Sequence, residues 1–129
     1  MPKPKQPRPT DAELQILRVL WQRGASTVRE VYETISKTKP TGYTTVLKFM
    51  QIMAEKGLVR RDERERAHVY TAAQPRESTQ RQMAGDLLER AFSGSTKDLL
   101  VGALSARKAS RAELAELQQL LAEYSGGDK

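Results

Sequence analysis

The sequence of 129 residues predicts a mainly α-helical protein with one small β-hairpin, divided into two parts. Three observations lead to this fold class. Capping boxes, in which Ser or Thr is followed three residues later by Glu, precede three apolar runs at helical spacing. After Gly57 the pattern changes to short runs rich in β-branched residues around a charged turn. Beyond Gln74 the chain is again helical and rich in leucine.

The first elements follow from these capping boxes. Residues 1–9 hold three basic residues among four prolines and predict a flexible basic tail, either solvated or touching phosphate. The box TDAE begins a helix at Thr10, and Gly24 ends it. A second box, TVRE from Thr27, begins a shorter helix that the sequence KTKPTG breaks.

The third helix is predicted over residues 43–56 and ends at Gly57. Its apolar side chains share one face and predict a contact with the core; they are Val46, Phe49, Met50 and Met53. The opposite face is polar and consists of Thr44, Lys48, Gln51 and Glu55, with Thr45 on the flank and Thr41 just before the helix.

A β-hairpin is predicted next. Residues 58–61 and 67–71 have the composition of short strands, and the turn between them is charged. Three helices followed by such a hairpin are the order of a winged helix-turn-helix domain, here residues 10–75, with the hairpin as the wing.

The back half, residues 76–124, predicts three further helices that are too short and too rich in leucine to bury themselves alone. We therefore predict a dimerisation domain there and a frayed tail over residues 125–129. The predicted interface residues are Leu87, Leu88, Phe92, Leu99, Leu100, Leu104, Leu114, Leu117 and Leu121.

The composition of the chain excludes several classes of function. Cysteine is absent and His68 is the single histidine, so the chain has no constellation for nucleophilic, acid–base or metal catalysis, and we expect no enzyme, cofactor or metal. His68 is expected to be packed or solvated. No apolar run is long enough to cross a membrane or form a signal peptide, which predicts a cytoplasmic protein.

The charge is placed unevenly. Residues 1–75 hold 14 of the 22 Lys and Arg residues and 8 of the 16 acidic residues, whereas the remainder is neutral. A basic front half suggests a polyanionic partner. The polar face of the third helix suits phosphates and base edges through Thr41, Thr44, Thr45 and Lys48, and Arg64 and Arg66 suit the sugar-phosphate backbone. Ordinary solvated threonines remain the alternative.

Motifs along the chain resemble the BlaI/MecI/CopY family of bacterial repressors, named for control of penicillinase, methicillin-resistance and copper-transport genes. The matching stretches are TDAELQILRVLWQRG, TVREVYE, YTTVLKFMQIMAEKGLVRR, RAHVY, LLERAFSGSTKDLL and SRAELAELQQLL.

The resemblance implies a homodimeric winged-helix repressor that binds an inverted-repeat operator in double-stranded DNA. In this family the Thr-Thr helix enters the major groove, which implies roles for Thr44, Thr45 and Lys48, with Tyr43 beside them. The arginine at the start of the second wing strand corresponds to Arg66. The C-terminal helices are implied to form the dimer.

Two departures from the family pattern leave open which signal would release such a repressor from DNA. CopY-type members end in a cysteine cluster, and this chain has no cysteine, so copper sensing by thiolates is excluded. Other members are inactivated when a membrane-bound sensor protease leads to cleavage of an Asn-Phe bond, whereas Gly102-Ala103 stands here. A sensor protease is therefore an open partner, as are the operator, the target genes and any link to β-lactams.

Two other classes stay open beside the repressor. One is a winged helix used only for protein contacts, which predicts DNA binding with little salt dependence or none. The other is a regulator whose back half binds a small ligand, although no polar residues converge within its apolar faces.

Overall fold

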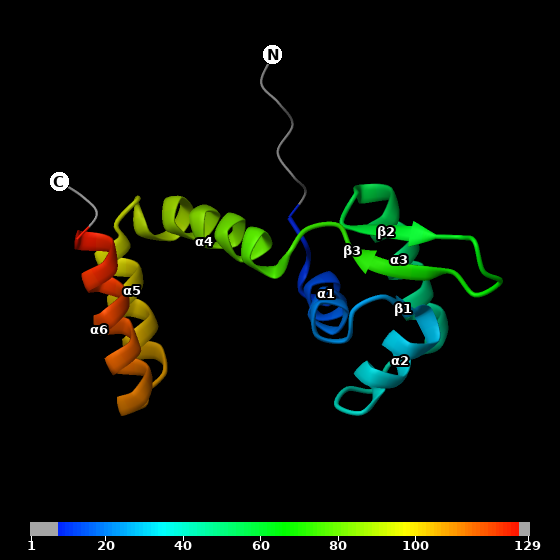
Figure 1. The fold of residues 1–129 in the computed structure, drawn as a ribbon, viewed down its shortest axis with the longest axis horizontal. Helices are drawn as coiled ribbons and strands as arrows, with labels where there is room; N and C mark the ends of the chain where they lie inside the picture. Colours follow the sequence, from blue (N-terminus) through cyan, green and yellow to red (C-terminus); the bar gives the residue numbers. More distant parts are fainter. Residues whose placement is uncertain (1–7, 127–129) are drawn as a thin grey trace, which may run out of the picture. The chain divides into compact units, whose positions relative to one another are not determined.

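The computed structural model describes residues 8–126, so most of the predicted basic tail and the last three residues lie outside the described part. The elements, in order, are α1 (Asp11–Arg23), β1 (Ser26–Thr27), α2 (Val28–Ser36), α3 (Tyr43–Lys56), β2 (Val59–Asp62), β3 (Val69–Ala72), α4 (Arg76–Phe92), α5 (Thr96–Ala106) and α6 (Arg111–Gly126) (Figure 1). The contacts divide the chain between Met83 and Ala84 into two units.

Both predicted capping boxes of the first unit are formed. The Thr10 hydroxyl accepts a hydrogen bond from Glu13 N at 3.2 Å, and the Glu13 carboxylate accepts one from Thr10 N at 2.9 Å. Thr27 and Glu30 form the same reciprocal pair at the start of α2. Each box satisfies amides that the first helical turn leaves without partners, so these two helices begin where the sequence predicts.

The core of the first unit lies between α1, α2, α3 and the sheet. Thirteen apolar side chains from these elements and their connections form one buried cluster, which includes Leu17, Val31 and Tyr70. From α3 it receives Val46, Met50 and Met53, each at most 2% exposed, while Phe49 packs only partly against it. The apolar face predicted for α3 is therefore its buried face.

The wing is a sheet of three antiparallel strands in the order β1-β3-β2, rather than the two-stranded hairpin predicted. The hairpin strands pair Val59 with Ala72 and Asp62 with Val69. The added strand β1 contains only Ser26 and Thr27, which pair with Tyr70 and Val69. A strand of two residues that leads directly into a helix has no alternating pattern to recognise, so sequence analysis missed it.

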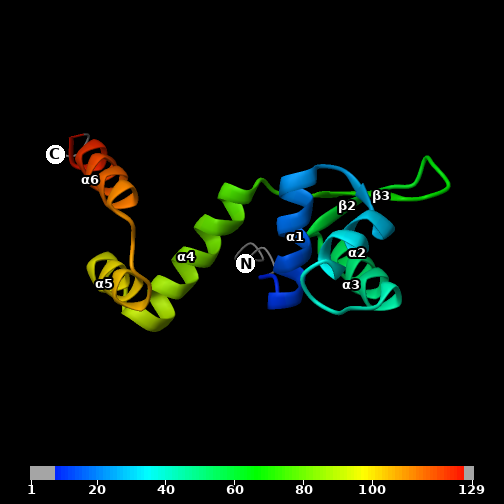
Figure 2. The same ribbon diagram turned by 90° about the horizontal axis from the view of Figure 1, so that it is seen from below.

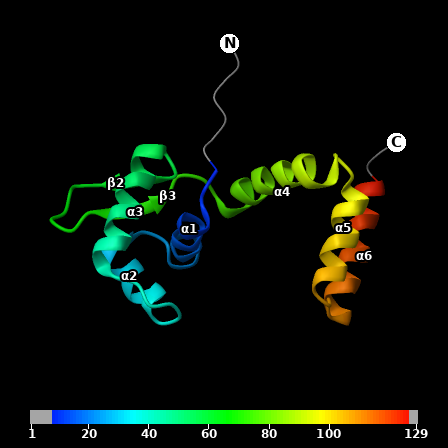
Figure 3. The ribbon, with the colours of Figure 1, turned by 180° about the vertical axis from the view of Figure 1, so that it is seen from behind.

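Figures 2 and 3 show the ribbon from two further directions, and the first unit can be followed in both. The loop between β2 and β3 extends beyond the helices (Figure 2). In the view from behind, α3 crosses in front of β2 and β3 (Figure 3). Residues 42–45 at the start of α3 and residues 63–68 of the wing loop are exposed, so both segments lie at the surface of this unit.

The second unit has little interior of its own. Its turn between α4 and α5 places Ser93 and Gly94 in left-handed backbone conformations, with φ of 49° and 80°, and Gly94 N donates to Leu88 O at 2.9 Å. The Ser95 hydroxyl caps α5 by accepting from Asp98 N at 3.0 Å. No residue of α5 is buried, nor is any of residues 111–125 in α6.

Candidate nucleic-acid interface

The outward face of α3 is built as the sequence predicts. Thr44, Thr45 and Lys48 are exposed, and Thr41 just before the helix is half-buried. The opposite face of α3 is held by Met50 and Met53, both at 0% exposure. This buried anchor fixes the direction of the helix, so the threonine hydroxyls and the Lys48 ammonium project into solvent where a duplex could approach.

The N-terminus of α3 also differs chemically from those of α1 and α2. Its N-cap is Gly42, and no side chain caps it, whereas threonine caps the other two helices. The first amides of α3 therefore keep free N–H groups beside the positive end of the helix dipole. An anion is favoured at such a position.

Tyr43, predicted beside the threonines, lies partly against α2. Its ring makes an edge-to-face contact with Tyr32, with centroids 5.8 Å apart, and the Arg29 guanidinium lies 5.1 Å from its centroid. The side chain remains 38% exposed. Tyr43 therefore joins α3 to α2 and remains partly open to solvent.

The two predicted wing arginines differ in their surroundings. Arg64 is tied to Asp62, with Nε to Oδ1 at 3.0 Å and Nη2 to Oδ2 at 2.7 Å. Hydrogen bonds from the side chain and backbone N–H of Arg64 lower the pKa of Asp62 to about 2. Arg66 is exposed, and no hydrogen bond or ion pair joins it to another described residue. Of these two charges, that of Arg66 is therefore the one available to a ligand.

A third wing arginine, Arg61, also has internal partners. It forms an ion pair with Glu63 at 2.7 Å. A hydrogen bond to the Tyr70 hydroxyl and the charge of Glu63 raise the pKa of Arg61 above its usual value. Arg61 therefore already has partners within the wing.

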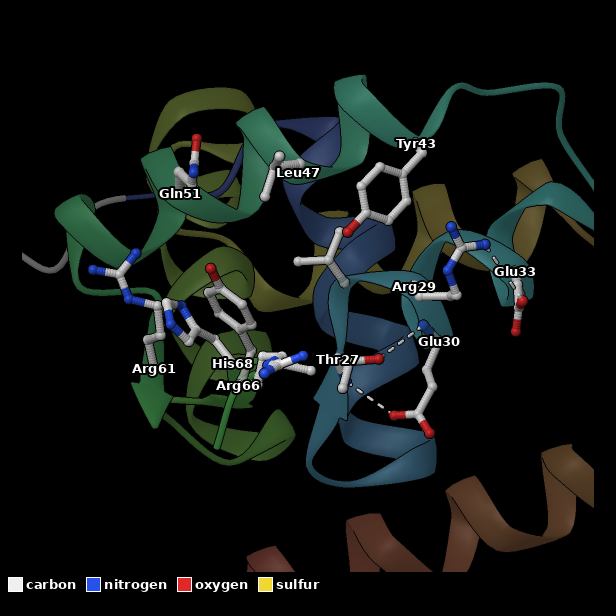
Figure 4. A pocket seen from close by; sticks show the side chains of 13 residues that line it. Thr27, Arg29, Glu30, Glu33, Tyr43, Leu47, Gln51, Arg61, Arg66 and His68 are labelled. Carbon is white, nitrogen blue, oxygen red and sulfur yellow. Dashed lines mark hydrogen bonds and ion pairs between the residues drawn. The ribbon is translucent and has the colours of Figure 1, made fainter. Parts of the chain in front are cut away.

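A hollow of about 620 Å³ separates the wing from α2 and α3 (Figure 4). Tyr43, Leu47 and Gln51 form its α3 wall, spaced four residues apart on one stripe of the helix. Arg29, Glu30 and Glu33 line it from α2, and Arg66 and His68 line it from the wing. The hollow therefore brings together basic side chains from two elements that are distant in the sequence.

Arg29, Gln51 and His68 were not among the predicted DNA-binding residues. Arg29 occupies an ordinary solvated position within a capping box, and Gln51 was placed only on the polar face of α3. His68 is exposed at the end of the wing loop, in keeping with the solvated role expected. No local sequence signal reports a shared hollow, because its walls meet only in the folded unit.

Within residues 8–126, no cluster of three or more His, Cys, Asp or Glu side chains could hold a metal ion. The helices of this described part are too short or too polar to span a bilayer. An exposed polar helix supported by an apolar core and followed by a basic wing defines the winged helix-turn-helix class of DNA-binding proteins.

Comparison with known proteins gives the family. The chain belongs to the penicillinase repressor family, which it matches over residues 9–123. It is 26% identical over 125 residues to the penicillinase repressor of Bacillus licheniformis, covering 97% of this chain and 98% of that protein. It is 34% identical over 119 residues to the transcriptional regulator BlaI of Mycobacterium tuberculosis, covering 91% of this chain and 85% of that protein.

A solved structure agrees with these relatives. The solution structure of the DNA-binding domain of the repressor BlaI matches with a TM-score of 0.51 and 27% identity, covering 57% of this chain and 90% of that one. The predicted resemblance and fold class are confirmed. The protein is a BlaI-type transcriptional repressor with a winged-helix domain, and its family is not one of enzymes.

Proposed function

We propose that this repressor acts in the cytoplasm as a homodimer that binds an inverted-repeat operator, with α3 of each copy in the major groove. One observation carries the proposal: Thr44, Thr45 and Lys48 are exposed on a helix that is anchored in the core by the buried side chains of its opposite face. Threonine can contact phosphate or base edges, and lysine can contact guanine or phosphate. None of these three side chains is needed by the core.

The wing holds the DNA backbone in this proposal. Arg66 is exposed without an internal ion pair among the described residues, so its guanidinium can bind a phosphate without first losing a partner. Arg64 contributes less, because Asp62 already neutralises it. Contacts of this kind set position rather than sequence preference.

The dimer is supported by the exposed apolar side chains of the second unit. Of the predicted interface residues, Leu87, Leu104, Leu114 and Leu121 are exposed by 39–56%, and the other five are half-buried. Val101, Leu120 and Tyr124 are further exposed apolar residues that the prediction omitted. A second copy would remove this surface from water, which favours residues 76–124 as a dimerisation domain.

Derepression in this proposal acts through the dimer. Each half-site of an inverted repeat is held by one copy, so any signal that separates the copies weakens both contacts at once. Proteolysis by a sensor protease is one such signal. At the position of the family's Asn-Phe bond, Gly102 lies on α5 against Phe92, where an added Cβ would come within 3.4 Å of the ring.

A gel-shift titration against salt tests the proposal. The purified full chain is titrated against an operator obtained by in vitro selection and against a mixed-sequence duplex of equal length. We expect specific affinity about 10³-fold or more tighter than non-specific affinity, with the logarithm of affinity falling steeply with the logarithm of salt concentration. Flat salt dependence would instead support a protein-binding role.

A further inference from the structure

We propose that Arg29, on α2, is a further DNA-binding residue that contacts the phosphate backbone across the hollow from Arg66. The inference rests on the proposed function, because it assigns Arg29 a contact with the stretch of DNA backbone that lies between the recognition helix α3 and the wing. It adds a third element, α2, to the DNA-binding face.

The position of Arg29 is the first support. Its side chain is 65% exposed and lines the hollow, with its guanidinium 5.1 Å from the centroid of Tyr43. Tyr43 is the first residue of α3, so the cation is held where the recognition helix begins. A guanidinium that stacks on a ring by its face still has N–H donors in its plane, and these suit phosphate oxygens.

The acidic residues of the hollow do not prevent this contact. Arg29 approaches Glu33 at 3.9 Å, an exposed pair beyond hydrogen-bond distance, and such pairs contribute little. Glu30 is already engaged, because it accepts from Thr27 N at 2.9 Å and pairs with Arg23 at 3.4 Å. A phosphate would therefore displace only a weak internal partner.

The opposite wall supplies the second support. Arg66 lines the hollow from the wing, while Arg61 and Arg64 of the wing are tied to Glu63 and Asp62. Figure 4 shows Arg29 and Arg66 approaching the hollow from different elements, α2 and the wing. A sugar-phosphate strand that follows the hollow would thus meet an available cation on each side, and each contact would release bound counterions.

A purely structural role for Arg29 makes a different prediction. If its cation only holds the Tyr43 ring, then removing the charge disturbs α3 and weakens binding, but the number of phosphates neutralised stays the same. The slope of the logarithm of affinity against the logarithm of salt concentration distinguishes the two roles, since each phosphate contact contributes about 0.9 to it.

The experiment measures this slope by fluorescence anisotropy, with the full chain and a mixed-sequence duplex, so that no operator sequence is required. Arg29→Met keeps an apolar stem over Tyr43 and removes the charge, and Arg29→Gln is a second neutral variant. Arg29→Lys keeps the charge. Arg18→Met is the matched control, because Arg18 is an exposed arginine on α1 that lies outside this hollow.

The neutral variants at position 29 are expected to lower the slope by about one unit, as is Arg66→Ala, and the double variant by about two. Arg29→Lys should retain the wild-type slope, and the control should not change it. Neutral variants that fold, as judged by thermal melting, and keep the wild-type slope would overturn the inference. Absence of salt-dependent binding by the wild-type chain would overturn the proposed function itself.

Discussion

Lys48 lies on the exposed face of α3, and no core residue depends on it. We predict that Lys48→Ala weakens binding to the selected operator by about 1–3 kcal/mol, because one contact to a base edge or phosphate is lost. Thr44→Ala should act in the same direction. Isothermal titration with the operator measures the change.

Two comparisons make this prediction specific. Thermal melting should show unchanged stability for Lys48→Ala. Lys97→Ala, which removes an exposed lysine from α5, should bind the operator as the wild type does. Full-strength operator binding by Lys48→Ala would mean that α3 is not the helix in the groove.

A second prediction concerns the ion pair that joins the start of α1 to the end of α3. Glu13 is 2% exposed, and its carboxylate accepts from Lys56 Nζ at 2.8 and 2.9 Å. Burial raises the pKa of Glu13, but hydrogen bonds from Lys56 and from Thr10 N outweigh it, so the pKa lies below 4.5. Glu13→Gln should cost about 1–3 kcal/mol of unfolding free energy at pH 7.

The pH dependence of this cost follows from the direction of the pKa shift. The folded pKa of Glu13 is the lower one, so its stabilising effect is complete above the unfolded value and is lost as pH falls through the folded value. Urea titrations should therefore show the wild-type advantage over Glu13→Gln at pH 6–7 and its decline below pH 4.5. An advantage that does not change with pH would contradict this account.

At the scale of elements, two arginines of the wing differ in whether a nearby acidic side chain already binds their charge. Arg64 is 87% exposed yet bound to Asp62, whereas Arg66 has no such partner among the described residues. We predict that Arg64→Ala lowers the salt slope of DNA binding less than Arg66→Ala does, because its charge is already compensated. Anisotropy titrations measure both slopes.

The same comparison has an internal control. Asp62→Asn removes the partner of Arg64 and should steepen the salt slope, since an uncompensated cation then faces the duplex. If Arg64→Ala, Arg66→Ala and Asp62→Asn all kept the wild-type slope, the wing would not touch DNA.

At the scale of the whole molecule, the second unit leaves its leucines uncovered. Leu121 is 56% exposed, so Leu121→Asp should not unfold a single copy. We predict that it separates the dimer and, because each half-site is held by one copy, that operator affinity falls at least about 100-fold. Analytical ultracentrifugation measures the first effect, and gel shift the second.

Glu116→Gln on the same helix α6 is the matched control for this prediction, since it alters charge without placing an acid among leucines. It should remain dimeric. A wild-type chain that sediments as a monomer would remove the assignment of residues 76–124 to dimerisation.

Sequence by itself determined the local elements and the faces of the helices. Capping boxes at Thr10 and Thr27, the apolar stripe of α3 and the change of pattern after Gly57 are short-range signals, because helix caps and side-chain periodicity depend only on near neighbours. They were enough to predict the fold class and the exposure of Thr44 and Lys48.

Tertiary structure alone decided which charges are available. The strand β1 and the hollow shared by Arg29 and Arg66 depend on how distant segments meet after folding, and the pairing of Arg64 with Asp62 depends on the conformation of the wing loop. An arginine looks the same in the sequence whether it is paired or unpaired. Only the geometry of its neighbours decides whether its charge can reach a phosphate.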